Sequence, residues 1–234
     1  MPSFQDLASG ESCVRLLDVR SGSSLQRLSG HSDNALVVCW SARDARLLFS
    51  GGADGRLLVW DVRSAKSFLK CLQQRPVGSA RAGLQHRSHS GSVNGLQQSA
   101  DGLWLVSLGT EGRLRVWDAV SGRPRTSGPS RRLQNAGQKV VQMAWGGATG
   151  LCFVPSGDEV ACVDLLGGGG TVSRLFGHHQ SVNACALRPS RQQLYSAAND
   201  HCILAWCPPT DRGAERTDVP ATAELVADRW SDED

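Results

Sequence analysis

The sequence predicts an all-β fold built from repeated units of short antiparallel strands, and three observations support it. One signature occurs three times, because a tryptophan is preceded by an acidic residue at six positions, a serine at ten and a histidine at 28 or 29. No stretch has the apolar spacing of an amphipathic helix. The 26 glycines among 234 residues suit a chain with many turns. The three sets are His31, Ser50, Asp54 and Trp60; His89, Ser107, Glu111 and Trp117; and His178, Ser196, Asp200 and Trp206.

The ends of these units add a second pattern. Two units begin with Gly-His, at Gly30-His31 and Gly177-His178, and two end with Trp-Asp, at Trp60-Asp61 and Trp117-Asp118. This is the WD-repeat pattern of β-propellers. Leu17-Asp18 and Val163-Asp164 stand where two further Trp-Asp pairs are expected. These four pairs and Trp206 mark the ends of five units. Most of the five marks are separated by roughly the 40 to 45 residues of one propeller blade.

The repeat boundaries follow from these marks. We expect a non-repeat N-terminus over 1–12, without a strand of its own, and an acidic C-terminal tail over 208–234. Propeller blades fill 13–207, with repeat units near 13–28, 29–63, 89–122, 139–166 and 177–207. One spacing is too long, and the polar, basic stretch 71–88 predicts a long loop there. The unit at 139–166 lacks the histidine, serine and acid, so its apolar runs and its spacing alone identify it.

The histidine, serine and acid of each set could be read as a hydrolase triad. Three copies in three units are not explained by one active site. A buried hydrogen-bond network that ties the strands of each blade together explains all three copies, because buried polar groups need partners. No other catalytic set occurs, so we expect a protein that is not an enzyme and that has no catalytic residue.

Other functional classes find little support. The eight cysteines include no C-x-x-C pair, so neither a metal site nor a cofactor is expected, and free thiols indicate a reducing compartment. No apolar run is long enough to cross a membrane. The net charge of +3 is too small to predict nucleic-acid binding. The arginine cluster in 123–132 is expected to be a solvated loop.

Chain length bears on how the propeller closes. About four blades and a partial blade fit into the sequence, whereas propellers are closed rings without open sheet edges. The sequence therefore favours the interpretation that the chain is the last part of a truncated seven-bladed propeller.

Three segments carry a more specific resemblance. The stretches "HSGSVNGLQQSADGLWLVSLGTEGRLRVWDAVSG" and "YSAANDHCILAWCP" and the acidic end "DRWSDED" resemble the C-terminal half of the Cockayne syndrome group A family. The resemblance implies a nuclear substrate receptor of a cullin-RING ubiquitin ligase in transcription-coupled nucleotide-excision repair. It also implies two kinds of partner, namely the damage-specific DNA-binding adaptor with its cullin-RING ligase, and repair proteins. A generic propeller scaffold without a ligase link remains the alternative.

Two groups of residues are candidates for partner binding. Receptors of this class often carry Trp-Asp-x-Arg, which stands intact at Trp60 to Arg63, so the resemblance implies that Asp61 and Arg63 contact the adaptor. It also implies that the adaptor is held largely by an N-terminal segment and early blades absent from this sequence, so binding should be weakened. Loop residues beside the acids at one rim are further candidates. These are Ala53, Thr110 and Asn199.

Overall fold

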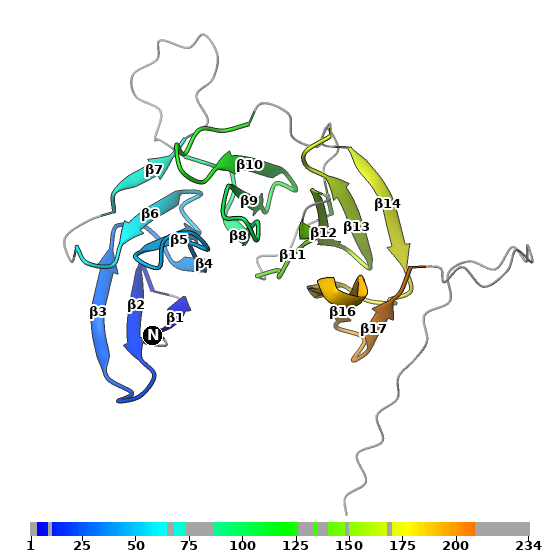
Figure 1. Ribbon diagram of the computed structural model, residues 1–234, viewed down its shortest axis with the longest axis horizontal. Helices are drawn as coiled ribbons and strands as arrows, with labels where there is room; N and C mark the ends of the chain where they lie inside the picture. Colours follow the sequence, from blue (N-terminus) through cyan, green and yellow to red (C-terminus); the bar gives the residue numbers. More distant parts are fainter. Residues whose placement is uncertain are drawn as a thin grey trace, which may run out of the picture.

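The computed structural model describes residues 4–8, 11–64, 68–73, 87–125, 133–134, 140–147, 150–167 and 170–208. Within them the chain forms five separate antiparallel sheets of three or four strands. Figure 1 shows the sheets arranged side by side along an arc, with the first and last sheets at its two open ends. The prediction of an all-β fold of propeller blades is confirmed. In this part of the chain no helix is long and apolar enough to span a bilayer.

Neighbours within each sheet follow the order of the chain. The first sheet consists of β1 (Phe4–Ala8), β2 (Cys13–Asp18) and β3 (Ser24–Ser29), and the second of β4 (Ala35–Trp40), β5 (Leu47–Gly52), β6 (Leu57–Asp61) and β7 (Lys70–Leu72). The third sheet consists of β8 (Val93–Gln98), β9 (Trp104–Gly109) and β10 (Leu114–Asp118). The fourth consists of β11 (Ala144–Trp145), β12 (Leu151–Ser156), β13 (Glu159–Asp164) and β14 (Thr171–Phe176), and the fifth of β15 (Val182–Arg188), β16 (Gln193–Ala198) and β17 (Ile203–Trp206).

Each mark that defined the repeats lies at the end of a strand. Trp60, Trp117 and Trp206 occupy the ends of β6, β10 and β17, and the two weaker marks end β2 and β13. The outer strands β7 and β14 lie between the repeat units expected from the sequence. A sequence repeat and a sheet are therefore offset, because each of these outer strands follows, and pairs with, the strand that ends in the Trp-Asp or Val-Asp pair.

The N-terminus differs from the expectation. Residues 1–12 were expected to lack a strand, but Phe4–Ala8 forms β1 and pairs antiparallel with β2 over its whole length. The segment FQDLA does not alternate apolar and polar residues, so periodicity could not reveal it. β1 pairs with N–H and C=O groups of β2 that would otherwise lie at a sheet edge.

Two other expectations concern loops. Most of the long loop at 71–88, the acidic tail from residue 209 onward, and Arg131 and Arg132 lie outside the described residues. Arg125 of the basic cluster is not a solvated side chain. Its guanidinium lies 5.3 Å from the ring centroid of Trp104, and its Nη2 donates to the Leu166 carbonyl at 2.9 Å. The aromatic face and the carbonyl stabilise the cation, so it bridges the third and fourth sheets.

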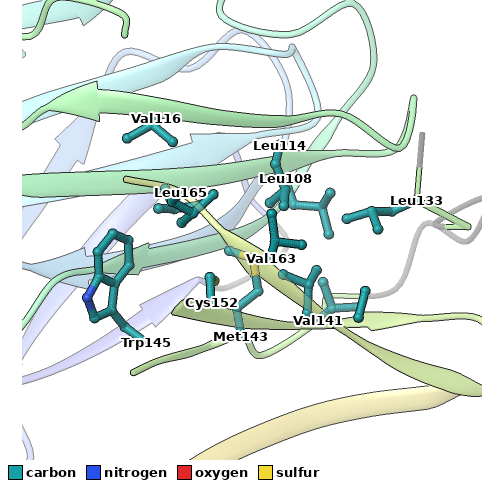
Figure 2. Packing of buried hydrophobic residues seen from close by; sticks show 13 residues of the cluster. Leu108, Leu114, Val116, Leu133, Val141, Met143, Trp145, Cys152, Val163 and Leu165 are labelled. Atoms are coloured by element: carbon teal, nitrogen blue, oxygen red, sulfur yellow. The ribbon is translucent and has the colours of Figure 1, made fainter. Parts of the chain in front are cut away.

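The core consists of apolar layers between neighbouring sheets. Figure 2 shows the largest layer, in which Leu108 and Leu114 of the third sheet face Met143, Cys152 and Val163 of the fourth. All five side chains are buried. Burying a side chain of this size stabilises a fold by about 1.5 to 3 kcal/mol, so these layers hold the arc together.

Backbone hydrogen bonds also join the sheets along the inner side of the arc. The Val141 amide donates to the Asn94 carbonyl, and the Gln142 amide donates to the Asn183 carbonyl, each at 2.9 Å. The Ser88 and His89 amides donate to Gly55, whose φ is +74°. A side chain at Gly55 would meet the His89 carbonyl at 2.6 Å, so glycine is needed for this close approach.

Candidate functional site

The structure brings the four residues of each sequence signature together in the second, third and fifth sheets. In each set the histidine Nε2 bonds the serine Oγ, the tryptophan Nε1 donates to the same Oγ, and the histidine Nδ1 meets the carboxylate. The Nε2–Oγ distances are 2.7, 2.7 and 2.8 Å at His31, His89 and His178; the tryptophan–serine distances are 2.8, 2.9 and 2.8 Å; and the Nδ1–carboxylate distances are 3.1, 2.7 and 2.9 Å.

The chemistry of the groups fixes the direction of these bonds. Tryptophan can only donate and an ionised carboxylate can only accept. The serine hydroxyl therefore accepts from the indole and donates to Nε2, and Nδ1–H donates to the acid. Burial disfavours ionisation of Glu111, but the bond and the charge of His89 together with backbone amides, including that of Gly91, outweigh it, and the pKa of Glu111 falls to about 2. Burial lowers the pKa of His89, which favours the neutral ring.

The networks are closed to substrates. Ser50, Ser107 and Ser196 are all buried, and each hydroxyl is already occupied by an indole and an imidazole. A nucleophile must be reachable by the atom that it attacks. The geometry therefore supports a structural network. Among the described residues, no group of three or more His, Cys, Asp or Glu could hold a metal ion.

The three loop candidates lie at one end of the sheets, which we call the upper rim (turns 53–56, 110–113 and 199–202). Ala53 donates its amide to the Asn34 carbonyl, Thr110 Oγ1 accepts the Ser92 amide at 3.1 Å, and Asn199 Oδ1 accepts from Asn183 at 2.6 Å. All three are half-buried and engaged in these turn contacts. The structure places them at equivalent positions but spreads them over three sheets.

Asp61 and Arg63 lie at the other end of β6, on what we call the lower rim (turns 41–46, 61–64, 99–103 and 119–122). Arg63 donates Nε to Oδ1 of Asp61 at 3.0 Å and Nη2 to Oδ2 at 2.6 Å, and its amide also bonds Oδ1. These bonds hold the pKa of Asp61 at about 2. The guanidinium side chain remains 63% exposed, whereas the carboxylate side chain is 13% exposed.

Sequence reasoning missed a second pair on the lower rim. Arg46 donates Nε to Asp44 Oδ1 at 2.9 Å, and the Val62 amide donates to the Arg46 carbonyl, so this pair lies beside Asp61. A signal was present, because Asp44-Ala45-Arg46 repeats the Asp-x-Arg spacing of the recognised motif. In the degraded copy, Arg20 bonds Asp18 through its backbone amide alone.

Comparisons with known proteins agree with this architecture. The family model described as WD domain, G-beta repeat matches residues 22–61, 83–118 and 169–207. The chain is similar to WD repeat-containing protein ATCSA-1 of Arabidopsis thaliana, with 29% identity over 94% of this chain and 62% of that protein. It is also similar to Denticleless protein homolog A of Xenopus laevis, with 23% identity over 97% and 36% of the two chains.

A third relative is WD repeat-containing protein slp1 of Schizosaccharomyces pombe, which is 30% identical over 61% of this chain and 25% of its own length. The chain thus spans less than two thirds of the length of the curated relatives that it matches. Three family matches fall on sheets that carry the complete network, and five sheets stand in blade order. The chain therefore contains WD repeats, and its described residues form a partial WD40 propeller.

Proposed function

We propose that this chain is a substrate-recognition subunit, or a shortened form of one, of a cullin-RING ubiquitin ligase that acts in transcription-coupled nucleotide-excision repair in the nucleus. The resemblance to the Cockayne syndrome group A family and the similarity to ATCSA-1 support the proposal. The single structural observation that carries it is the Asp61–Arg63 pair, which holds an exposed guanidinium in a fixed orientation on the lower rim.

The partners in this proposal are the damage-specific DNA-binding adaptor, the cullin-RING ligase behind it, and transcription-coupled repair proteins. Asp61 and Arg63 would contact the adaptor, and the upper-rim residues Ala53, Thr110 and Asn199 are candidates for other proteins.

A generic WD-repeat scaffold without a ligase link is the second candidate function. It is favoured by the variety of the relatives, which include Nuclear distribution protein nudF and Histone acetyltransferase type B subunit 2. Asp-x-Arg after a tryptophan strand also fits this reading, since an arginine beside an aspartate can simply stabilise a turn.

Co-purification tests the choice. The tagged chain should retain the purified adaptor and, through it, the cullin. Arg63→Ala should reduce this retention, whereas Arg20→Ala, which alters the degraded copy of the motif, should not. A chain that captures neither protein, or whose capture is unchanged by Arg63→Ala, would favour the scaffold reading.

A further inference from the structure

The lower rim of the second and third sheets forms one continuous surface. Arg63 is bonded to Asp61, which lies within electrostatic range of Arg46. In the same turn as Arg46, Arg43 packs so closely on Gly102 that any side chain there would collide with it. The next residue, Leu103, accepts the Ala119 amide at 2.8 Å and so lies beside the turn that contains Val120.

Gln98 fixes the junction between the two sheets. Its buried side chain accepts the Ala42 amide at 2.7 Å and donates to the Gly102 carbonyl at 3.0 Å. One residue thus holds turn 41–46 of the second sheet against turn 99–103 of the third. A surface whose turns are held in this way loses little conformational entropy when a partner binds.

In both Arg–Asp pairs of this surface, the arginine is more exposed than its aspartate. The side chains of Arg63 and Arg46 are 63% and 56% exposed, whereas their partners Asp61 and Asp44 are 13% and 35% exposed. Each arginine uses Nε and Nη2 for its own aspartate, and Nη1 takes no part in either pair. With Arg43, the rim therefore presents guanidinium groups outward over the deeper carboxylates of Asp61 and Asp44. The exposed carboxylate of Asp101 lies within electrostatic range of Arg43.

Two exposed apolar side chains, Leu103 and Val120, lie beside the arginines, and we call this pair the apolar step. Leu103 is 41% exposed and Val120 is 73% exposed, and they lie on neighbouring turns of the third sheet. Asp118 accepts the Val120 and Ser121 amides at 2.9 and 2.7 Å, so the turn that presents Val120 is itself ordered. Arginine is enriched at protein interfaces, and exposed apolar side chains that lie together can mark an interaction site.

We propose that this lower-rim surface, from Arg63 through Arg46 and Arg43 to Leu103 and Val120, binds a protein segment that presents carboxylates next to an exposed apolar side chain. Carboxylates match the outward guanidinium groups, and the apolar side chain matches the step. The deeper aspartates and the apolar step both disfavour a nucleic-acid phosphate backbone at this place. The inference rests on the proposed function to the extent that the adaptor supplies this segment.

The test uses two probes on the full chain. The first is the purified adaptor, and the second is a fluorescent peptide with two leucines between aspartates, paired with a matched peptide that has lysines instead. Leu103→Ser with Val120→Ser should weaken binding of both the adaptor and the aspartate peptide about tenfold, as should Arg63→Ala. The control double variant is Val172→Ser with Ile203→Ser, at positions 62% and 65% exposed on β14 and β17.

The outcomes separate this inference from the proposed function. If Arg63→Ala weakens adaptor binding but the Leu103–Val120 variant behaves like the control, the apolar step is overturned and the proposed function stands. If the chain ignores the adaptor but binds the aspartate peptide with the expected losses, the surface stands and the proposed function fails. Equal binding of the lysine peptide, or no binding of either peptide, overturns the surface.

Discussion

The third sheet joins its middle strands through Ser107, His89, Glu111 and Trp117, whereas the fourth sheet has none of these residue types at the corresponding places. In β10 Trp117 faces Leu105, two residues before Ser107, and in β13 Val163 faces Cys152, two residues before Val154. Val154 and Val163 therefore occupy the positions in the fourth sheet that Ser107 and Trp117 occupy in the third, and both are fully buried.

The difference shows what the network contributes. The fourth sheet keeps its strand pairing with buried apolar side chains and with an ion pair between Glu159 of β13 and Arg174 of β14. The His-Ser-acid-Trp network is therefore not needed to form a blade. Its turn between β12 and β13 has shrunk to residues 157–158, whereas the third sheet has the longer turn 110–113 with Glu111. The network thus joins turn 110–113 of the upper rim to the loop that carries His89.

The largest expected effect comes from removing a tryptophan. Trp117→Ala should destabilise the chain by about 3 to 5 kcal/mol, because it leaves a large cavity and removes the indole hydrogen bond to Ser107. The counterpart Val163→Ala should cost about 1 to 3 kcal/mol. Urea unfolding of both variants measures the difference. Equal losses would mean that the indole bond and volume add nothing beyond ordinary apolar packing.

Removing the buried hydroxyl from the third sheet, or adding one at the corresponding place in the fourth, should have a smaller effect on stability. Ser107→Ala leaves Nε1 of Trp117 and Nε2 of His89 without a partner in a buried site, and should cost about 1 to 3 kcal/mol. Val154→Thr adds a hydroxyl without a partner at the corresponding place and should also destabilise. Thermal melts of the two variants test this, and a neutral Val154→Thr would show that the fourth sheet can satisfy a buried hydroxyl.

Acid should weaken the third sheet through both titrating groups of its network. The pKa values of His89 and Glu111 are lowered in the folded chain, so their stabilisation is complete above the ordinary histidine pKa of about 6.5 and is lost as the pH falls. The Glu111 part is lost between about 4.5 and about 2. Unfolding free energies measured against pH for the chain and for Glu111→Gln test this, and identical curves would refute it.

The smallest effect concerns the turn glycine. Gly112 has φ +76°, and a side chain there would collide with the Leu133 carbonyl, whereas His201 at the corresponding turn of the fifth sheet has φ +63° and is exposed. Relieving this backbone should make His201→Gly stabilising by less than about 1 kcal/mol. Gly112→Ala should instead be destabilising. Calorimetry should show a higher melting temperature for His201→Gly and a lower one for Gly112→Ala. Changes in the same direction would contradict the argument.

Most of the fold was predictable because its signals are local. The spacing of His89, Ser107 and Trp117 encodes the strand lengths and the register of a blade, and the apolar runs around Val154 and Val163 encode a blade without the network. β1 was not predictable, because backbone pairing to the edge of β2 leaves no trace in side-chain periodicity. The stacking of Arg125 on Trp104 depends on how two sheets meet, which residue spacing does not encode.

The candidate site was predictable only in part. Asp61 and Arg63 could be recognised from the spacing of their motif, and the resemblance gave them a role. Their neighbours on the lower rim come from turns far apart in the sequence. Gln98 brings turn 41–46 to turn 99–103, and only the folded chain shows that Leu103 and Val120 then stand beside the arginines.

The arrangement of sheets along an open arc, each joined to the next by an apolar layer and by bonds such as Val141 to Asn94, makes the molecule a one-dimensional chain of nearest-neighbour couplings. Within the described residues, each interior sheet contacts a sheet on both sides, whereas the first and fifth sheets each contact one. Loss of structure should therefore start at β1–β3 or β15–β17 and advance inward. The lower-rim surface, on the second and third sheets, would persist after the fifth sheet has frayed, so recognition and global stability would be governed by different parts of the arc.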